Sequence, residues 1–504
     1  MAATGTVETE IKFGAGPGFT LPDLSGVAPG VTVVEAPTLD LDAVYVDTAD
    51  LRLVRRGVSL RRRTGEGAPR WTLKLPDQGT GGIALARREF DVESDEADVP
   101  PDLADLVAAW VRRTPLVPVT TIRTRRRRVV LTNNGVALAE VADDVVSVIE
   151  GDEQVAARFR EIEVELTPGA SPDLLTLVAG ALERAGAGKP DRTTKVVRAL
   201  GPRALAPPDL CWDEVGPRAS MADLVIAALA DAARQIIDHD HVVRLDDDPE
   251  GVHLTRVGAR RLRSAVSTFG PVLDPIWADG LRAELAWIAT LLGAVRDTDV
   301  LLGRFWAMGQ DLDESDHGAA ALVVARLDTE RRNHLGALLG AMRTERYLYL
   351  LEGVAAAASA PPLTPAANGR AAELAPELVR PRWTQLRRTV ERLGERPSDE
   401  AQHEVRILAK RARYAAEFVA PVVGAPAKTL GHGLAVVADL LGELHDTAVA
   451  VAWLRGLVPV LSHAEAMVAG QLIAAERRRA DELRRVWPAA WAACDQKSSL
   501  RWLR

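Results

Sequence analysis

The sequence predicts an α+β protein with two domains, an antiparallel β-barrel with a charged interior followed by an all-α domain. Up to about residue 200, short segments alternate charged and apolar residues with period two, which is typical of strands with one polar face. Beyond residue 218, long stretches rich in Ala, Leu and Arg have a period near 3.6, which indicates a helical bundle. We therefore expect domains at residues 1–200 and 218–504, joined by a proline-containing linker at residues 201–217.

The segment Glu8-Thr9-Glu10-Ile11-Lys12 is the clearest of the alternating segments. In an extended strand Glu8, Glu10 and Lys12 share one face, and the two residues between them lie on the other. Three charges on one face would be costly in a dry core. The face is therefore either the solvated side of an edge strand or the wall of a cavity that holds ions.

The same alternation recurs along the first domain, in Leu60 to Arg63, Trp71 to Lys74, Arg87 to Glu89, Arg123 to Arg127 and Glu161 to Glu165. Several strands of this kind suit a closed antiparallel barrel with a polar interior. Glutamate oxygens suit hard divalent cations, and the forked donors of arginine suit phosphate. The pattern therefore predicts that this tunnel binds a polyanion together with divalent cations.

The distribution of residue types limits the chemistry of the first domain. All nine histidines lie at or after His239, and both cysteines, Cys211 and Cys494, lie beyond residue 200. An enzyme in the first domain would therefore rely on metal-activated water with carboxylate assistance. The formal net charge is -8, so any polyanion site must be a local concentration of positive charge.

The cysteine usage indicates reduced thiols and a cytoplasmic protein. The N-terminus lacks the basic and apolar regions of a signal peptide, and no apolar run reaches membrane-spanning length. We therefore expect no membrane partner.

Turn and helix signals outline the first domain further. Residues 13–35 are rich in Gly and Pro and are expected to form an irregular connection. Residues 64–70 predict a hairpin loop, and Asn133-Asn134-Gly135 predicts a tight hairpin turn with a strand at 136–141. Short helices are expected at residues 103–113 and 171–185.

The helical part contains an internal repeat, with copies at about residues 218–360 and 370–490. His253, Arg256, Arg260 and Arg263 recur 150 residues later as His403, Arg406, Lys410 and Arg413. Residues 292–297 are echoed by residues 441–446. Each basic set falls on one face of a helix. The two stripes are either solvated basic faces or the facing walls of a channel for a phosphate chain, and the duplicated histidine favours the channel.

The first 200 residues resemble a CYTH domain, the family of triphosphate tunnel metalloenzymes. The motifs that carry the resemblance are Glu8 to Lys12, Tyr45 to Thr48, Leu60 to Arg63, Thr72 to Lys74, Arg87 to Phe90, Arg123 to Arg128, Glu161 to Glu165 and Thr194 to Arg198. The resemblance implies an eight-stranded antiparallel tunnel that binds triphosphates with Mg²⁺ or Mn²⁺ and, in most members, hydrolyses them.

Carried onto this chain, the resemblance suggests three groups of residues in the tunnel. The catalytic group is Glu8, Glu10, Lys12 and Lys74. The metal ligands are Glu8, Glu10, Glu161 and Glu163, with Glu89 and Glu165 as further candidates. The substrate-binding group is Arg61, Arg63, Arg87, Arg123, Arg125 and Lys195.

Residues 218–490 resemble a CHAD domain, the conserved-histidine α-helical domain that is often fused to CYTH. The matching stretches are Val252 to Arg263, Leu292 to Leu302, His403 to Phe418 and Leu440 to Val449. The resemblance implies a pair of four-helix bundles that bind long-chain inorganic polyphosphate through His253, Arg256, Arg260, Arg263, His403, Arg406, Lys410 and Arg413. Asp297 and Asp446 are expected to hold neighbouring arginines, and His445 replaces an Asn of the family pattern.

The leading hypothesis is therefore a metal-dependent inorganic triphosphatase, acting on tripolyphosphate, joined to a polyphosphate-binding module. One alternative is a non-catalytic scaffold that binds polyphosphate or its granules, and another is a hydrolase or cyclase that acts on thiamine triphosphate or ATP. Nucleic-acid binding is disfavoured because the chain is acidic and only 4% of its residues are aromatic.

Overall fold

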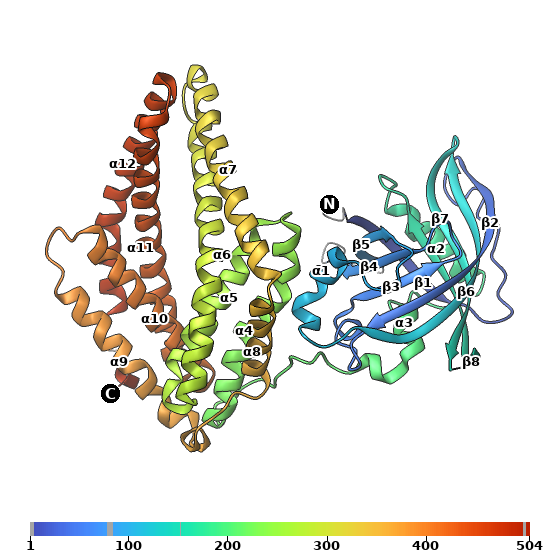
Figure 1. The fold of residues 1–504 in the computed structure, drawn as a ribbon, viewed down its shortest axis with the longest axis horizontal. Coiled ribbons are helices and arrows are strands. Elements are labelled where there is room, and N and C mark those ends of the chain that lie inside the picture. Colours follow the sequence, from blue (N-terminus) through green and yellow to red (C-terminus); the bar gives the residue numbers. More distant parts are fainter. Residues whose placement is uncertain (1–4, 78–83, 152, 497–499, 504) are drawn as a thin grey trace. The chain divides into compact units, whose positions relative to one another are not determined.

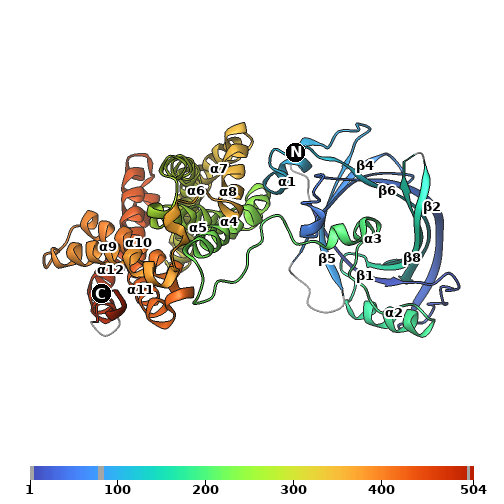
Figure 2. The ribbon, with the colours of Figure 1, turned by 90° about the horizontal axis from the view of Figure 1, so that it is seen from below.

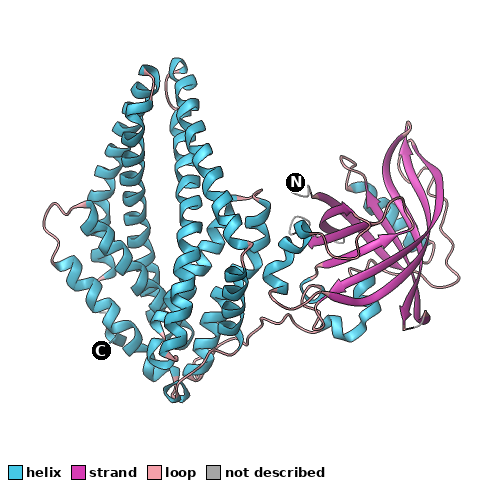
Figure 3. Ribbon diagram, viewed as in Figure 1, coloured by secondary structure: helices cyan, strands magenta, loops and turns pink. Residues whose placement is uncertain are grey.

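The computed structural model describes residues 5–77, 84–151, 153–496 and 500–503. The chain divides into two compact units, Met1–Asp209 and Leu210–Arg504. Strands dominate the first unit and helices make up the second, as Figures 1 and 3 show. This arrangement confirms the predicted α+β fold class.

The described strands of the first unit close into an antiparallel barrel in the order β1-β5-β4-β3-β2-β6-β7-β8 (Figure 2). β1 completes the ring because it pairs with β5 on one side and with β8 on the other. The strands are β1 (Thr6–Gly14), β2 (Val31–Asp47), β3 (Ser59–Thr64), β4 (Arg70–Pro76), β5 (Leu85–Glu93), β6 (Val117–Asn133), β7 (Val136–Glu150) and β8 (Gln154–Leu166).

The loops agree with most of the turn signals. Asn134 and Gly135 both have positive φ between β6 and β7, as a tight hairpin turn requires. The loop between β3 and β4 matches the predicted hairpin at residues 64–70. Two expectations are wrong: residues 31–35 belong to β2, and the strand after the turn continues to Glu150. Val31 is buried in the outer core of the barrel, which explains why a segment near so many glycines still forms a strand.

The outer face of β1 sets the direction of its charges. Ile11 and Phe13 are buried under α2 (Asp173–Arg184), in a core that also contains Val164 and Val178. Because side chains alternate across a strand, this packing turns Glu8, Glu10 and Lys12 toward the barrel interior. The edge-strand alternative is therefore wrong.

A short helix, α3 (Lys195–Leu200), lies across the ring of strands in Figure 2. Thr194 caps this helix by accepting a hydrogen bond from the backbone N–H of Val197. Val196 is buried in an apolar cluster with Tyr45, Ile122 and Val146, and these three side chains come from β2, β6 and β7. The cluster fills part of the barrel interior and fixes the helix that carries Lys195.

Three further elements belong to the barrel unit: α1 (Pro101–Val111) and the 3₁₀ turns at Val54–Arg56 and Gly201–Leu205. Asp209 lies 2.5 Å from Nη2 of Arg112, which follows α1, and 3.3 Å from Nη2 of Arg56. These ion pairs hold residues 201–209 on the barrel unit.

The second unit consists of two sets of antiparallel helices. The first set is α4 (Met221–Leu245), α5 (Pro249–Thr268), α6 (Pro275–Gln310), α7 (His317–Met342) and α8 (Glu345–Ser359). The second is α9 (Ala371–Glu391), α10 (Asp399–Val423), α11 (Ala425–Leu457) and α12 (His463–Cys494). Short 3₁₀ turns lie at Gly270–Val272, Glu314–Asp316, Pro365–Asn368, Val458–Val460 and Arg501–Leu503.

The two sets pack against each other through several pairs of helices. Phe305 of α6 and Leu327 of α7 share a core with Leu454 of α11 and Leu472 of α12. Elsewhere α5 faces α10, because Nη2 of Arg260 donates to the hydroxyl of Tyr414 at 2.9 Å. None of the helices in the described part of the chain is long and apolar enough to cross a membrane.

Candidate functional site

The barrel encloses a cavity of about 380 Å³ with a charged lining. Its lining draws on β1, β3, β4, β5, β8 and α3, among other elements. The predicted residues that it brings together are Glu8, Glu10, Lys12, Arg61, Arg63, Lys74, Arg87, Glu89, Glu163, Glu165 and Lys195.

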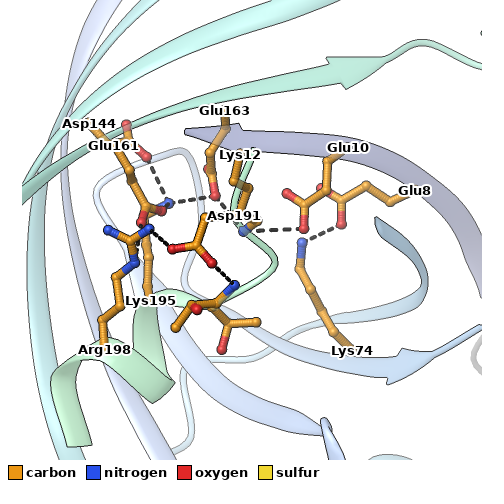
Figure 4. Close-up of polar contacts among 12 residues, drawn as sticks. Glu8, Glu10, Lys12, Lys74, Asp144, Glu161, Glu163, Asp191, Lys195 and Arg198 are labelled. Atoms are coloured by element: carbon orange, nitrogen blue, oxygen red, sulfur yellow. Dashed lines mark hydrogen bonds and ion pairs between the residues drawn. The ribbon is translucent and has the colours of Figure 1, made fainter. Parts of the chain in front are cut away.

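Two lysines separate the carboxylates of this cavity (Figure 4). Nζ of Lys74 donates to Glu8 and lies 3.2 Å from Oε2 of Glu89. Nζ of Lys12 lies 2.6 Å from Oε1 of Glu163 and 3.2 Å from a carboxylate oxygen of Glu10. Burial alone would lower the pKa of Lys12, but the carboxylates of Glu10 and Glu163 outweigh it and raise the pKa.

Carboxylates are crowded at the junction of β1 and β8. Burial and the nearby carboxylate of Glu8 raise the pKa of Glu165 to about 8. Such a cluster of oxygen donors has the chemistry that hard divalent cations prefer. Carboxylate oxygens of the kind that a divalent cation could use are therefore concentrated at this junction.

A second acidic cluster lies beside Lys195. Asp144, Glu161 and Glu163 each offer a carboxylate oxygen within 4.8 Å of the others, and all three side chains are buried. Nζ of Lys195 contacts the three carboxylates at 2.9, 2.7 and 2.8 Å, respectively (Figure 4). Glu161 is absent from the lining of the main cavity, so the structure places it behind Lys195.

Sequence reasoning missed Asp144, because the strand after the hairpin turn was expected to end at residue 141. The register supplies the missing signal: Asp144 on β7 pairs with Glu161 on β8. Had the strand after the hairpin turn been expected to continue to residue 144, Asp144 would have been placed opposite the Glu161 to Glu165 segment.

The arginines of β6 that line the cavity are Arg126 and Arg128. The expected placement of Arg123 and Arg125 in the tunnel is wrong. Arg125 is exposed, and Arg123 is bound by Asp42 and Glu153 at 2.8 and 3.0 Å on the outer face. Since consecutive side chains of a strand point to opposite faces, Arg123 and Arg125 cannot point inward when Arg126 and Arg128 do.

The cations of the cavity are only partly neutralised by acids: Nη2 of Arg63 lies 3.1 Å from Glu66, but other donors have no carboxylate partner among the described residues. Arg87 of β5 is 6% exposed, and no carboxylate in the described part of the chain lies within 4.0 Å of its guanidinium. Arg61 donates to the hydroxyl of Tyr45 at 3.3 Å, and the buried Nε atoms of Arg61, Arg63 and Arg87 have no acceptor. Burial and the neighbouring Arg61 lower the pKa of Arg63. A buried charge without a partner is costly, so this wall is suited to an added anion.

The helical unit contains a second charged cavity, of about 600 Å³, between α5, α6, α10 and α11. The predicted residues in its lining are His253, Arg256, Arg260, His403, Arg406, Lys410 and Arg413. Arg296 and His445 also line it, although no role was predicted for either. Arg263 does not line the cavity; it lies about 15 Å along α5 from His253, beyond the end of the lining.

The matched arginines of the two repeats have similar surroundings. Arg256 lies next to Gly293, and Arg406 lies next to Gly442: a Cβ added at these glycines would be 3.6 and 3.5 Å from the guanidinium. Nη2 of Arg256 also lies 3.2 Å from Asp297, as expected for an aspartate that holds an arginine. The duplication therefore preserves the contact between the arginine and the glycine, whereas Arg256 and Asp297 form an ion pair within 4.0 Å and, among the residues that the structure describes, Arg406 and Asp446 do not.

The comparisons with known proteins agree with the two units. A model of the CYTH domain matches residues 7–200, and a model of the CHAD domain matches residues 227–455. An uncharacterized protein of Mycobacterium tuberculosis (strain H37Rv) is 33% identical over 476 residues, which cover 88% of this chain and 87% of that protein.

Two solved structures are similar to part of the chain. PptA from Streptomyces chartreusis is 25% identical, covers 54% of this chain and 100% of its own, and has a TM-score of 0.46. The CHAD domain from the plant Ricinus communis is 26% identical, covers 56% of this chain and 96% of its own, and has a TM-score of 0.47.

Proposed function

The chain belongs to the proteins that join a CYTH domain to a CHAD domain, and from this premise we propose that it is a divalent-metal-dependent inorganic triphosphatase whose helical unit binds polyphosphate. The observation that carries the proposal for the barrel is the unneutralised Arg87 beside a wall of crowded carboxylates. An arginine wall suits phosphate oxygens, and a carboxylate wall suits the cations that accompany them. A tunnel built only to bind an anion would need the first wall but not the second.

The arginines would bind and orient the phosphate chain. Arg61, Arg63 and Arg87 lie in one lining and present buried donors without acceptors. Arg126 joins them from β6, already oriented by Asp144 at 2.9 and 2.7 Å. Donors that are fixed before the substrate arrives stabilise the charge that develops on the phosphoryl oxygens without a reorganisation cost.

The carboxylates would hold the metal and accept a proton. Glu8, Glu10 and Glu165 would form one metal site, with Glu89 as a further ligand. Asp144, Glu161 and Glu163, which hold Nζ of Lys195 in this structure, would form a second site where the metal takes the place of that ammonium group. When bound, a divalent cation neutralises phosphate charge and lowers the pKa of coordinated water. Since residues 1–200 contain neither His nor Cys, a glutamate of this wall would accept the proton of the attacking water.

The residue types that line the cavity favour an inorganic substrate over thiamine triphosphate or ATP. Tyr45 is the one aromatic side chain among the described residues that line it. The hydroxyl of Tyr45 contacts Arg61 at 3.3 Å, and its ring packs in the apolar cluster with Val196. Little aromatic surface is left on which an organic ring could stack.

The helical cavity supports the second half of the proposal. Nε of Arg406 is buried without an acceptor, and Lys410 has no carboxylate within 4.0 Å in the part of the chain that the structure describes. Burial and neighbouring cations lower the pKa of Arg256 and of Arg406. Cations that destabilise one another are suited to a polyanion, and binding of long-chain polyphosphate would also bring the protein to polyphosphate granules.

The direct test is phosphate release by the full chain from tripolyphosphate, with ATP and thiamine triphosphate in parallel, with and without Mg²⁺ or Mn²⁺. We expect metal-dependent release from tripolyphosphate that is lost in Glu10→Gln and retained in the control Glu35→Gln, because Glu35 is exposed on β2. Binding of long-chain polyphosphate should persist in Glu10→Gln and weaken in Arg406→Ala. Absence of turnover with every substrate, alongside tight polyphosphate binding, would favour the scaffold alternative.

A further inference from the structure

The two repeats contribute different kinds of charge to the helical cavity. At two matched positions the first repeat has arginine where the second has a titratable residue: Arg260 is matched by Lys410, and Arg296 is matched by His445. Arginine stays charged throughout the physiological pH range, whereas lysine and histidine can lose their charge when buried among cations. The first repeat therefore contributes one titratable base to the cavity lining, His253, whereas the second contributes three, His403, Lys410 and His445.

The titratable groups of the second repeat lie side by side. The rings of His403 and His445 have centroids 4.1 Å apart, and Nδ1 of His403 is buried without a hydrogen-bond partner. The charged groups around Lys410 are Arg256 and Arg260 of α5, Arg406 of α10 and Asp446 of α11. Three of these four neighbours are cations.

The surroundings of the two histidines are also mostly cationic. His445 faces His403, Arg406 and Lys410 of α10, and its acidic neighbour is Asp297 of α6. His403 faces Arg406 and Lys410. No acid in the described part of the chain makes an ion pair with either histidine.

The electrostatics of the free protein follow from this arrangement. Burial, together with Arg260 and Arg406, lowers the pKa of Lys410 to about 7. Burial, together with His403 and Arg406, lowers the pKa of His445 to about 4. Burial and Arg406 lower the pKa of His403 as well. Near neutral pH the second repeat therefore contributes less positive charge to the cavity than its residues could supply.

We propose that the helical cavity is a proton-linked polyanion site, in which a bound polyphosphate chain causes Lys410, His403 and His445 to take up protons from solvent. The inference rests on the proposed polyphosphate-binding function and adds how its affinity is regulated. A chain of phosphates favours the charged form of each neighbouring base, and by thermodynamic linkage protonation then strengthens binding. The protein would bind polyphosphate more tightly as the surrounding pH falls.

The sign of the dependence can be stated for Lys410. Below about pH 7 the lysine is already charged in the free protein, so a change of pH has little effect through this group. Above that pH, the free protein must acquire a proton in order to bind. The dissociation constant should then rise by up to about tenfold per pH unit for each proton taken up.

Calorimetric titration of the full chain with long-chain polyphosphate tests the inference. The titration is done without divalent cations, so that the tunnel does not turn over, at several pH values between about 6 and 8.5 and in two buffers of different ionisation enthalpy. The difference between the buffers gives the number of protons taken up. Internal phosphates of a long chain titrate far below this range, so the uptake reports on the protein.

Matched substitutions identify the groups. Lys410→Arg keeps the charge but cannot titrate, so we expect up to about three quarters of a proton less at pH 7.5, close to one proton less at pH 8.5, and a flatter pH profile. His445→Arg, which copies Arg296 of the first repeat, should flatten the profile at lower pH. Lys428→Arg, at an exposed lysine on α11, should leave the uptake unchanged.

The outcomes separate this inference from the function on which it rests. Absence of binding at every pH would overturn the proposed polyphosphate-binding function and the inference with it. Binding without proton uptake, or an uptake that Lys410→Arg and His445→Arg both leave intact, would overturn the inference alone. Should one variant fail to fold by circular dichroism, the other variant decides.

Discussion

Arg126 on β6 and Asp144 on β7 form a two-pronged ion pair inside the barrel, with Nε and Nη2 of the arginine 2.9 and 2.7 Å from the two carboxylate oxygens. Asp144 is fully buried and also lies 2.9 Å from Nζ of Lys195 on α3. One aspartate thus holds a cation from the wall and a cation from the helix that crosses the ring. The pair is possible because Arg126 and Asp144 are opposite each other in the β6–β7 register.

We expect Arg126→Ala to lower kcat/KM for tripolyphosphate by about 10²-fold or more, because it removes a fixed donor from the cavity. Arg125→Ala is the matched control: this arginine is the preceding residue of the same strand but is exposed on the outer face. Steady-state phosphate release gives both values. Equal losses in the two variants would contradict the assignment of the inner face.

Arg87→Met should stabilise the free protein and weaken substrate binding. The change removes a buried charge that has no acidic partner within the described residues, and such replacements are often stabilising by about 1–4 kcal/mol. We expect a higher thermal midpoint without ligand and at least about tenfold weaker binding of tripolyphosphate. Arg88→Met serves as the control, since Arg88 lies over the ring of Phe90. A lower midpoint for Arg87→Met would show that this charge is neutralised in the free barrel.

The hairpin between β3 and β4 should depend on Gly65. Its φ is +100°, and a Cβ at this position would lie 2.0 Å from the carbonyl oxygen of Asp40. Gly65→Ala therefore combines backbone strain with a clash, and we expect a loss of more than about 2 kcal/mol in urea unfolding. At Gly67, where φ is +68° and no atom lies within 4 Å of an added Cβ, the same substitution should cost less. Similar losses at the two sites would argue against the close approach to Asp40.

The N-terminus of α12 should show a pH-dependent contribution to stability. Hydrogen bonds from the Ser462 hydroxyl and backbone, together with Arg326 at 3.1 Å, lower the pKa of Glu465 to about 2. A lowered pKa contributes stability that is present above the ordinary value near 4.5 and is lost as the pH falls toward 2.

Glu465→Gln should therefore lower the thermal midpoint at pH 7, and the difference from the parent chain should shrink as the pH falls below about 4.5. Thermal unfolding followed by circular dichroism at a series of pH values measures this difference. Glu404→Gln, at an exposed residue of α10, is the control and should change the midpoint little at any pH. A constant difference across the series would mean that Glu465 acts through packing and not through its charge.

Much of the candidate site could be predicted because many of its charged residues lie in short segments with a clear alternating pattern. Two glutamates and a lysine alternate in β1, and an apolar residue at Ile11 shows that the other face is buried. The Glu161 to Glu165 segment carries the same information for β8. In each strand one set of alternate residues is charged and the other set is apolar. The alternation therefore also predicts which face of the strand is turned toward the barrel interior.

The β6 segment lacked that information. Residues 125–128 are all arginine, so both faces of the strand carry charge. No apolar face is present in this run to predict which arginines point into the barrel. Pairing with β2 and β7 decides the matter, because it places Arg126 opposite Asp144. A run of identical residues thus determines that a strand is charged on both faces but not which charges are buried.

By itself, the sequence determined the two-unit organisation, the charged interior of the barrel and the duplication of the helical stripe, because these depend on local periodicity and on a constant repeat offset. The tertiary structure alone decided which β6 arginines are inside, that Asp144 completes an acidic cluster with Glu161 and Glu163, and that Arg263 lies outside the helical cavity. It also decided that Lys410 and His445 lie among cations from α5 and α10. These features depend on which strands and helices become neighbours, because electrostatic interactions depend on the distance between charges in space, and folding brings together charges that are far apart in the sequence.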